Sequence, residues 1–537
     1  MHKQASPFGT VIRYVDSVRN RRLSLTSLSA GERVRRERRR ATGAERASSP
    51  WRCVVMKAST AWLSEAEKSR IADQAMELLA GVGMRFAGSA VLPQLAARGA
   101  QVDEATGIAR LPRELVEWAL AQCPRRVVFA GARPEDDVVL DDGEPFHFAP
   151  SGCVAKTLDF RTGVRRASTL KDLRETTGLN DELPQLDVMW TQVSATDVPL
   201  EQRELVEYFT LLTETRKHVT FVDPPDDPVA VGRICELLAG DLERFRERPR
   251  ISTVLTAASP LQIDGPALDI HIALARHGVP VHAYTMSIAG ATSPVTLAGS
   301  VVQGVAEFLG AATALQVAAP GARLIFCFGT GVLDMLRTTF SMGNVESAQM
   351  GAMATEVGHF LGVPTLNPGF STDSKQPGLQ AGYEKALKTV GVCSADPDIV
   401  SGWGLLDSHN TMYLPQSVVD NEIAAMVRRL QAPVEVSTAT LAAGSIARVG
   451  PGGGFLAERE TAKRIRAGEH YLPTVSNRHS YEKWVEDGVT ENDVAEAEVE
   501  RLLAKHAGRS CLETDKIDEL AALCAVDHAS VRRAHRA

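Results

Sequence analysis

Polar and ionisable side chains crowd residues 369–384, where a predicted strand at 364–368 gives way to a helix from about residue 378. Residues 372–375 read TDSK and residues 380–384 read QAGYE. A carboxylate, an ammonium group and hydroxyls on one loop can bind a charged substrate or move a proton. In a barrel of alternating strands and helices, the loops after the strands carry the active site. The candidate catalytic residues are therefore Asp373, Lys375 and His409. His409 follows the last predicted strand and is the best acid–base candidate.

Other side chains near the ends of predicted strands are suited to a small organic cation, which ring faces and a counter-charge can hold. The candidates for substrate binding are Tyr284, Phe328, Asp334, Gln380, Tyr383, Glu384 and Trp403.

Each candidate also has a structural explanation. The aromatic rings of Tyr284 and Phe328 could be barrel core, and Asp334 could cap the next turn. Lys375 could be a structural partner for Asp373 or Glu384, and His409 could serve only to order its loop. The sequence alone leaves these alternatives open.

Cysteine and histidine spacing gives no support for a metal site. The eight cysteines contain no CxxC pair, and the 13 histidines contain no HExxH and no His-x-Cys pair. Reduced, mostly buried thiols are expected. A zinc site assembled from distant residues stays open.

Strands and helices alternate from about residue 144. Eight short apolar runs predict strands at 146–149, 187–193, 218–222, 251–256, 281–286, 323–328, 364–367 and 399–403. Helical spacing of apolar residues predicts helices at 170–179, 201–213, 229–238, 267–277, 295–317, 345–361, 380–390 and 418–430. Strict alternation implies a parallel sheet, and eight units favour closure into a (β/α)8 TIM-type barrel. A doubly wound open sheet is the competing architecture, but no GxGxxG follows the first strand.

The predicted domains are a basic extension at 1–55, a helical cap region at 56–143, the barrel at 144–435 and a helical extension at 436–537 that packs on the barrel. The first 55 residues carry a net charge of +9 and the remainder −16. The run RVRRERRR at 33–40 is interpreted as a disordered tail or as sequence upstream of a start at Met56. The acidic body argues against nucleic acid as the main partner. No uninterrupted apolar run has the length of a membrane span, so we expect a cytoplasmic protein with no membrane partner.

Several motifs resemble, in order along residues 60–525, the trimethylamine methyltransferase (MttB-like) family. They are FRTGVRR at 160–166, TLKDL at 169–173, TSPVTLAG at 292–299, TDSK at 372–375, QAGYE at 380–384, PGGGFL at 451–456, YLP at 471–473 and YEKW at 481–484. Two departures stand out: Gly454 replaces a histidine that is frequent in the family, and nothing in this sequence encodes the pyrrolysine of the founding enzymes.

The resemblance implies an enzyme that demethylates a quaternary or tertiary methylated amine such as a betaine. It implies transfer of the methyl group to Co(I) of a separate corrinoid protein, with no tightly bound cofactor in this chain. A quaternary nitrogen is already cationic, so its tertiary amine leaves without protonation, which suits a chain without pyrrolysine. A barrel lyase and a non-catalytic module that binds betaine or the corrinoid protein are the alternatives, and a homo-oligomer is an open option.

Overall fold

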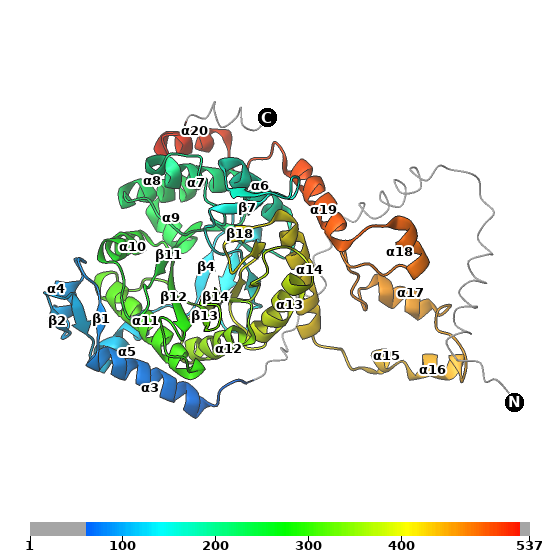
Figure 1. Cartoon of the computed structure of the whole chain (residues 1–537), viewed down its shortest axis with the longest axis horizontal. Helices are drawn as coiled ribbons and strands as arrows, with labels where there is room; N and C mark the ends of the chain where they lie inside the picture. Colours follow the sequence, from blue (N-terminus) through cyan, green and yellow to red (C-terminus); the bar gives the residue numbers. More distant parts are fainter. Residues whose placement is uncertain (1–60, 527–537) are drawn as a thin grey trace. The chain divides into compact units, whose positions relative to one another are not determined.

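The computed structural model describes residues 61–526, and the basic run at 33–40 and Met56 lie outside this range. Strands lie inside a ring of helices (Figure 1). Eight of these strands are parallel and follow one another in the order β6-β16-β15-β13-β12-β11-β10-β9. Their bounds are β6 (His147–Phe148), β9 (Val188–Trp190), β10 (His218–Phe221), β11 (Ile251–Thr256), β12 (Val281–Ala289), β13 (Leu324–Asp334), β15 (Thr365–Pro368) and β16 (Ile399–Ser401). Helices alternate with these strands: α6 (Leu170–Glu182), α7 (Leu200–Glu214), α8 (Pro228–Ala239), α9 (Leu242–Glu247), α10 (Gly265–His277), α11 (Leu297–Ala318), α12 (Val345–Phe360), α13 (Leu379–Cys393) and α14 (Leu414–Gln431). The predicted barrel is confirmed, and all eight predicted strands overlap a strand of the structure.

The barrel is closed between its first and second strands by hydrogen bonds outside the regular ladder. The amide of Asp187 donates to the carbonyl of Phe148 at 2.9 Å, and the amide of Phe148 donates to the Asp187 carboxylate at 3.0 Å. Val154 and Val193 form a parallel bridge further along. The strands therefore enclose an interior as a barrel does.

A β-hairpin of β4 (Val127–Phe129) and β5 (Val138–Leu140) contributes to the apolar cluster inside the barrel. The ring of Phe129 stacks on His218 with centroids 4.1 Å apart, and Trp190 lies edge-on to His282 at 5.2 Å. Burial lowers the pKa of His282 to about 3, so this histidine is a neutral member of the interior. Side chains of this cluster fill the barrel interior, so this part of the barrel is not a pore.

The region before the barrel is less helical than its sequence predicts. It contains the expected helices α3 (Glu65–Gly81) and α5 (Arg113–Gln122), with a short α4 (Leu92–Ala97). It also contains an antiparallel sheet of β1 (Met84–Arg85), β2 (Gln101–Asp103) and β3 (Ile108–Arg110), besides the β4–β5 hairpin. Strands of two or three residues are too short for period-two alternation to reveal, so the sequence predicted the helices of this region but not its strands.

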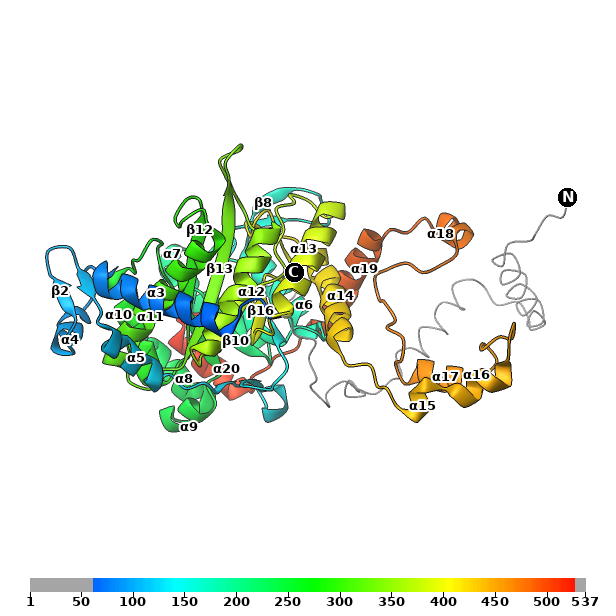
Figure 2. The same cartoon turned by 90° about the horizontal axis from the view of Figure 1, so that it is seen from below.

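Additional strands surround the carboxyl ends of the barrel strands, which we call the mouth. A four-stranded sheet joins β7 (Lys156–Leu158) and β8 (Arg165–Ala167) to β17 (Leu405–Leu406) and β18 (Thr411–Met412). On another side, β13 continues into a hairpin with β14 (Thr339–Ser341), which rises beyond the neighbouring strands (Figure 2). The loops after the first, sixth and eighth barrel strands are thus held by short sheets.

After α14 the chain passes through α15 (Thr438–Leu441), α16 (Ala443–Val449), α17 (Arg459–Arg466) and α18 (Tyr481–Asp487) before α19 (Glu491–His506) and α20 (Thr514–Leu523). Residues of α19 and α20 join the hydrophobic cluster formed by α6, α7 and α14. Residues 433–489, which we call the arm, contribute only Val475 to that cluster. The expectation that the whole extension packs on the barrel therefore fits α19 and α20 but not the arm.

Helix α11 is long and apolar enough to cross a membrane by length and composition alone. However, 83% of its most apolar window is buried inside the protein. It contacts α3, α5, α12 and β12, as a core helix of a barrel does.

Candidate functional site at the barrel mouth

His409 lies in the loop after β16 and reaches the loop after β6. Its Nδ1 is 3.3 Å from the Ser151 hydroxyl, while its Nε2 is buried and has no hydrogen-bond partner among residues 61–526. The ring packs on Gly402, where a Cβ atom would lie 3.1 Å from Nε2. Burial, together with the charges of Lys388 and Lys385, lowers the pKa of His409 to about 3. The imidazole is therefore neutral at neutral pH.

The backbone before His409 is held in an uncommon conformation. Asp407, Ser408 and His409 have φ angles of 56°, 51° and 65°. Such left-handed residues persist only where surrounding contacts impose them, and they gather at functional sites.

Asp373 supplies the main such contact. Its carboxylate accepts hydrogen bonds from the hydroxyls of Ser341 and Ser408 (2.7 Å for Ser408), and from the amides of Met342 (2.8 Å) and Gly343 (3.1 Å). Burial alone would raise the pKa of Asp373, but these hydrogen bonds outweigh it and lower the pKa. The carboxylate joins three mouth loops, with its accepting capacity used by the protein itself.

The remaining TDSK contacts strengthen the same junction. The amides of Asp407 and Ser408 each donate at 2.8 Å to carbonyls of this segment, on Ser374 and Thr372. Lys375 is exposed and lies 3.2 Å from the Asp407 carboxylate. This segment therefore clamps the His409 loop, and Lys375 forms its ion pair with Asp407 rather than with Asp373 or Glu384.

Glu384 closes the clamp from α13. Its carboxylate accepts from the Thr372 hydroxyl at 2.5 Å, from the Asp373 amide at 2.8 Å and from Gln380 at 2.9 Å. Tyr383, one residue earlier, is exposed. The QAGYE motif thus supports the loop from the helix side.

The other predicted substrate contacts are spread over the fold. Tyr284 points into the barrel against Gly329. Phe328 is fully buried against Gly304 of α11, outside the barrel interior, so the structure does not bring it to the mouth. Trp403 is buried against Phe370, with ring centroids 5.2 Å apart.

Asp334 caps the tip of the β13–β14 hairpin. It accepts from the amides of Leu336 and Arg337 at 2.9 and 3.0 Å and pairs with the Arg337 guanidinium. These contacts are those of a turn-capping residue, which was the structural alternative for Asp334.

Buried lysines near His409 were missed by sequence reasoning. Lys388 donates to the Met342 carbonyl at 2.9 Å, and burial lowers its pKa to about 7, an effect that the charge of Asp373 opposes. Lys385 pairs with Asp420 at 2.7 Å, with both side chains fully buried. Their positions three residues apart on one helix were a detectable signal, because such residues share a face.

Two acidic side chains lie at another part of the mouth. Glu207 accepts from the Ala195 amide at 2.9 Å, and burial raises its pKa to about 7. Asp223 follows β10, and its negative charge also raises the pKa of Glu207. Burial and the charge of Glu204 raise the pKa of Asp223 itself.

A cavity of about 70 Å³ lies at the opposite, amino-terminal end of the barrel, lined among others by Arg125, His147, His359 and Asp398. Ligand pockets usually measure about 300–1,000 Å³ and, in barrels, lie at the mouth. We therefore place the candidate site at the mouth.

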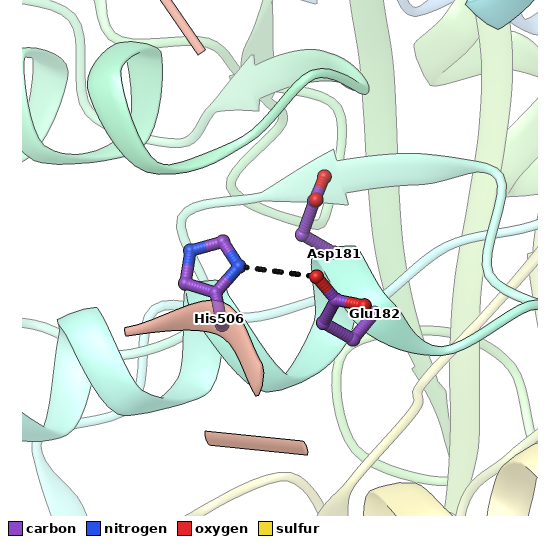
Figure 3. A group of neighbouring side chains, drawn as sticks. All are labelled: Asp181, Glu182 and His506. Atoms are coloured by element: carbon purple, nitrogen blue, oxygen red, sulfur yellow. Dashed lines mark ion pairs between the residues drawn. The ribbon is translucent and has the colours of Figure 1, made fainter. Parts of the chain in front are cut away.

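Asp181, Glu182 and His506 form a buried group with the composition of a metal site (Figure 3). Cationic groups already occupy its carboxylates. Glu182 pairs with Lys505, Arg509 and His506, and Asp181 lies 3.6 Å from the Arg216 guanidinium. We interpret the group as an ion-pair network that ties α19 to α6.

An eight-stranded parallel barrel with its uncommon backbone and buried ionisable groups at the mouth is the architecture of a barrel enzyme. The family model "Trimethylamine methyltransferase (MTTB)" matches residues 31–531. The chain belongs to this family, which confirms the resemblance found in the sequence.

Curated relatives agree. Trimethylamine methyltransferase MttB of Methanosarcina barkeri is 30% identical over 80% of this chain and 88% of its own. MttB of Desulfitobacterium hafniense is 29% identical over 80% and 86%. Glycine betaine methyltransferase of Desulfitobacterium hafniense is 26% identical over 83% and 92%.

Proposed function

We propose that this chain demethylates a quaternary or tertiary methylated amine, with a betaine as the favoured substrate, and passes the methyl group to a separate corrinoid protein. Family membership makes the chain an amine methyltransferase. The relatives include enzymes named for a tertiary amine and for a quaternary amine. The choice between these substrates depends on the protonation chemistry of the mouth.

The neutral state of His409 carries the preference for a quaternary amine. With its pKa lowered to about 3, His409 is not an imidazolium at neutral pH and has no extra proton for a leaving amine. A quaternary nitrogen needs none, because the C–N bond breaks with its electron pair on nitrogen and leaves a neutral tertiary amine. The chemistry of the side chain and that of the substrate thus agree.

His409 can still donate a hydrogen bond. When the Ser151 hydroxyl donates to Nδ1, the single ring proton resides on Nε2, the nitrogen without a partner. A betaine carboxylate would accept a hydrogen bond from that donor. Such a bond is favourable because a buried donor without a partner costs free energy. Burial raises the pKa of Glu207 and Asp223, and the cationic end of the same molecule would favour their ionised forms, so these carboxylates would serve as its counter-charge.

The rim of the mouth suits a protein partner. Large apolar side chains are exposed at or just after the carboxyl ends of several barrel strands: Leu200, Val229, Val295, Met335, Leu336, Val345 and Leu379. Leu336 at the hairpin tip is 92% exposed. Exposed apolar side chains grouped in this way are typical of interaction surfaces. The corrinoid would supply a reduced cobalt nucleophile as methyl acceptor, while this chain binds and orients the amine and excludes water.

The test is a transfer assay with reduced cob(I)alamin and a panel of betaines and methylamines, followed by absorbance. Methylcobalamin formed with a betaine, but not with trimethylamine, supports the proposal. Turnover of substrate without any cobalamin would favour a lyase. Binding without transfer, even with a cognate corrinoid protein, would favour a binding module.

A further inference from the structure

The arm, residues 433–489, is unlike the rest of the described chain because it has almost no interior. Val475 is its only buried residue. Its helices α15 and α18 are nevertheless capped by Ser437 and Ser480, whose side chains accept amide hydrogen bonds. A segment of this length without a core does not offset its own ordering entropy.

Large apolar side chains of the arm are exposed over its whole length. They are Val434, Val436, Leu441, Ile446, Phe455, Leu456, Leu472, Tyr481, Trp484, Val485 and Val489. Five of them belong to the PGGGFL, YLP and YEKW motifs, which the barrel mouth does not use. Together they present on the order of 1,000 Å² of surface, and a stable protein–protein interface needs about 800 Å² from each partner.

The arm is anchored to its own body at few points. The Glu422 carboxylate accepts from the amides of Thr474, Val475 and Ser476 at 2.5–3.0 Å, and Arg429 donates to the Glu469 carbonyl at 3.0 Å. Next to this anchor, an open hollow of about 600 Å³ is lined by Leu430, Val434, Tyr471 and Arg478, among others. The anchor fixes the arm, while the hollow and the apolar side chains stay available.

The charge of the arm and its permanently exposed apolar surface indicate which partner binds it. Helix α17 carries four basic residues and one acidic residue in eight positions, and the arm as a whole is neutral, so the −16 of residues 56–537 lies on the body. A surface that needs cover in every molecule calls for a permanent partner. Another copy of the chain is always present, has an acidic body, and closes a two-fold assembly in which each arm is covered once.

We propose that the arm embraces a second copy of this chain in a two-fold dimer, with its apolar side chains and basic α17 against the partner's acidic body. The interface is independent of the substrate proposed above. It assigns the C-terminal motifs of the arm to assembly rather than to catalysis.

The test is sedimentation velocity of the full-length protein over a range of concentrations. The double variant Leu472→Lys/Trp484→Lys replaces two exposed apolar side chains of the arm, and the matched control Val82→Lys/Leu387→Lys replaces two exposed apolar side chains of the body. Wild type and control should be dimers, and the arm variant should dissociate at least about 100-fold more readily.

Hydrogen exchange provides a second test that needs no variant. The amides of residues 481–487 should lose protection when wild type is diluted to monomer. A wild type that is monomeric at micromolar concentration would overturn the proposal. So would an arm variant that dimerises like wild type, or one that loses only corrinoid-protein binding.

Discussion

Replacing Asp373 by asparagine tests whether the TDSK segment clamps the His409 loop. The carboxylate accepts from Ser341, Ser408 and two loop amides. An asparagine keeps one carbonyl oxygen for these donors and turns an NH₂ group toward the others. About two hydrogen bonds to a charged group are lost, each worth about 1.5–3 kcal/mol. Because solvent reaches part of the site, we expect Asp373→Asn to lower the free energy of unfolding by about 2–4 kcal/mol.

The loss should depend on pH with a defined sign. Hydrogen bonds outweigh burial and lower the pKa of Asp373, so the folded protein keeps this carboxylate ionised more strongly than the unfolded chain does. The stabilisation is complete above the unfolded pKa of about 3.9 and disappears as pH falls through the lower folded pKa. The difference between wild type and Asp373→Asn should therefore be full at pH 7 and shrink below about pH 4.

The assay is urea unfolding at pH 7 and at acidic pH, with the exposed ion-pair variant Lys375→Met as control. That control should change the free energy of unfolding by less than about 1 kcal/mol. Equal stability of Asp373→Asn and wild type at pH 7, or a difference that does not change with pH, would refute the clamp.

Three further changes probe the core of the site. Ser151→Ala should reduce methyl transfer roughly 5- to 10-fold with unchanged circular dichroism, because His409 Nδ1 loses the Ser151 hydroxyl as its hydrogen-bond partner. Unchanged transfer would contradict the assignment of the ring proton to Nε2. The stability of His409→Gln should fall less than that of wild type between about pH 6.5 and pH 4. Folding lowers the pKa of His409 to about 3, so in wild type only the unfolded chain takes up the proton in this range. Thermal unfolding at both pH values measures the effect, and an equal loss of stability in both proteins would count against a buried neutral ring. Lys385→Met should cost about 3–5 kcal/mol of unfolding free energy by leaving Asp420 charged and buried, whereas a loss below 1 kcal/mol would mean that the pair is hydrated.

Periodicity was sufficient to predict the barrel. Buried parallel strands are continuous apolar runs and the covering helices keep a 3.6-residue spacing, so each predicted strand overlaps an observed one. Strands as short as β1 and β17 lie below the length at which such patterns can be recognised.

The site was harder to predict, because residue type does not tell whether an ionisable group is already used. The sequence marks Asp373 as a catalytic candidate and Glu384 as a substrate-binding candidate, yet in the fold their oxygens accept hydrogen bonds from loop donors. Phe328 precedes a mouth loop but belongs to the outer face of its strand. The buried lysines Lys385 and Lys388 matter electrostatically only because α13 turns them inward, which needs the tertiary packing.

The most direct test of the proposed function compares glycine betaine and trimethylamine as methyl donors to cob(I)alamin, with wild type and His409→Asn side by side at pH 7. We expect wild type to form methylcobalamin from glycine betaine and not from trimethylamine, and His409→Asn to lose most of that activity while remaining folded. Transfer from trimethylamine alone, or an undiminished rate in His409→Asn, would contradict a site built around a neutral histidine and a quaternary amine.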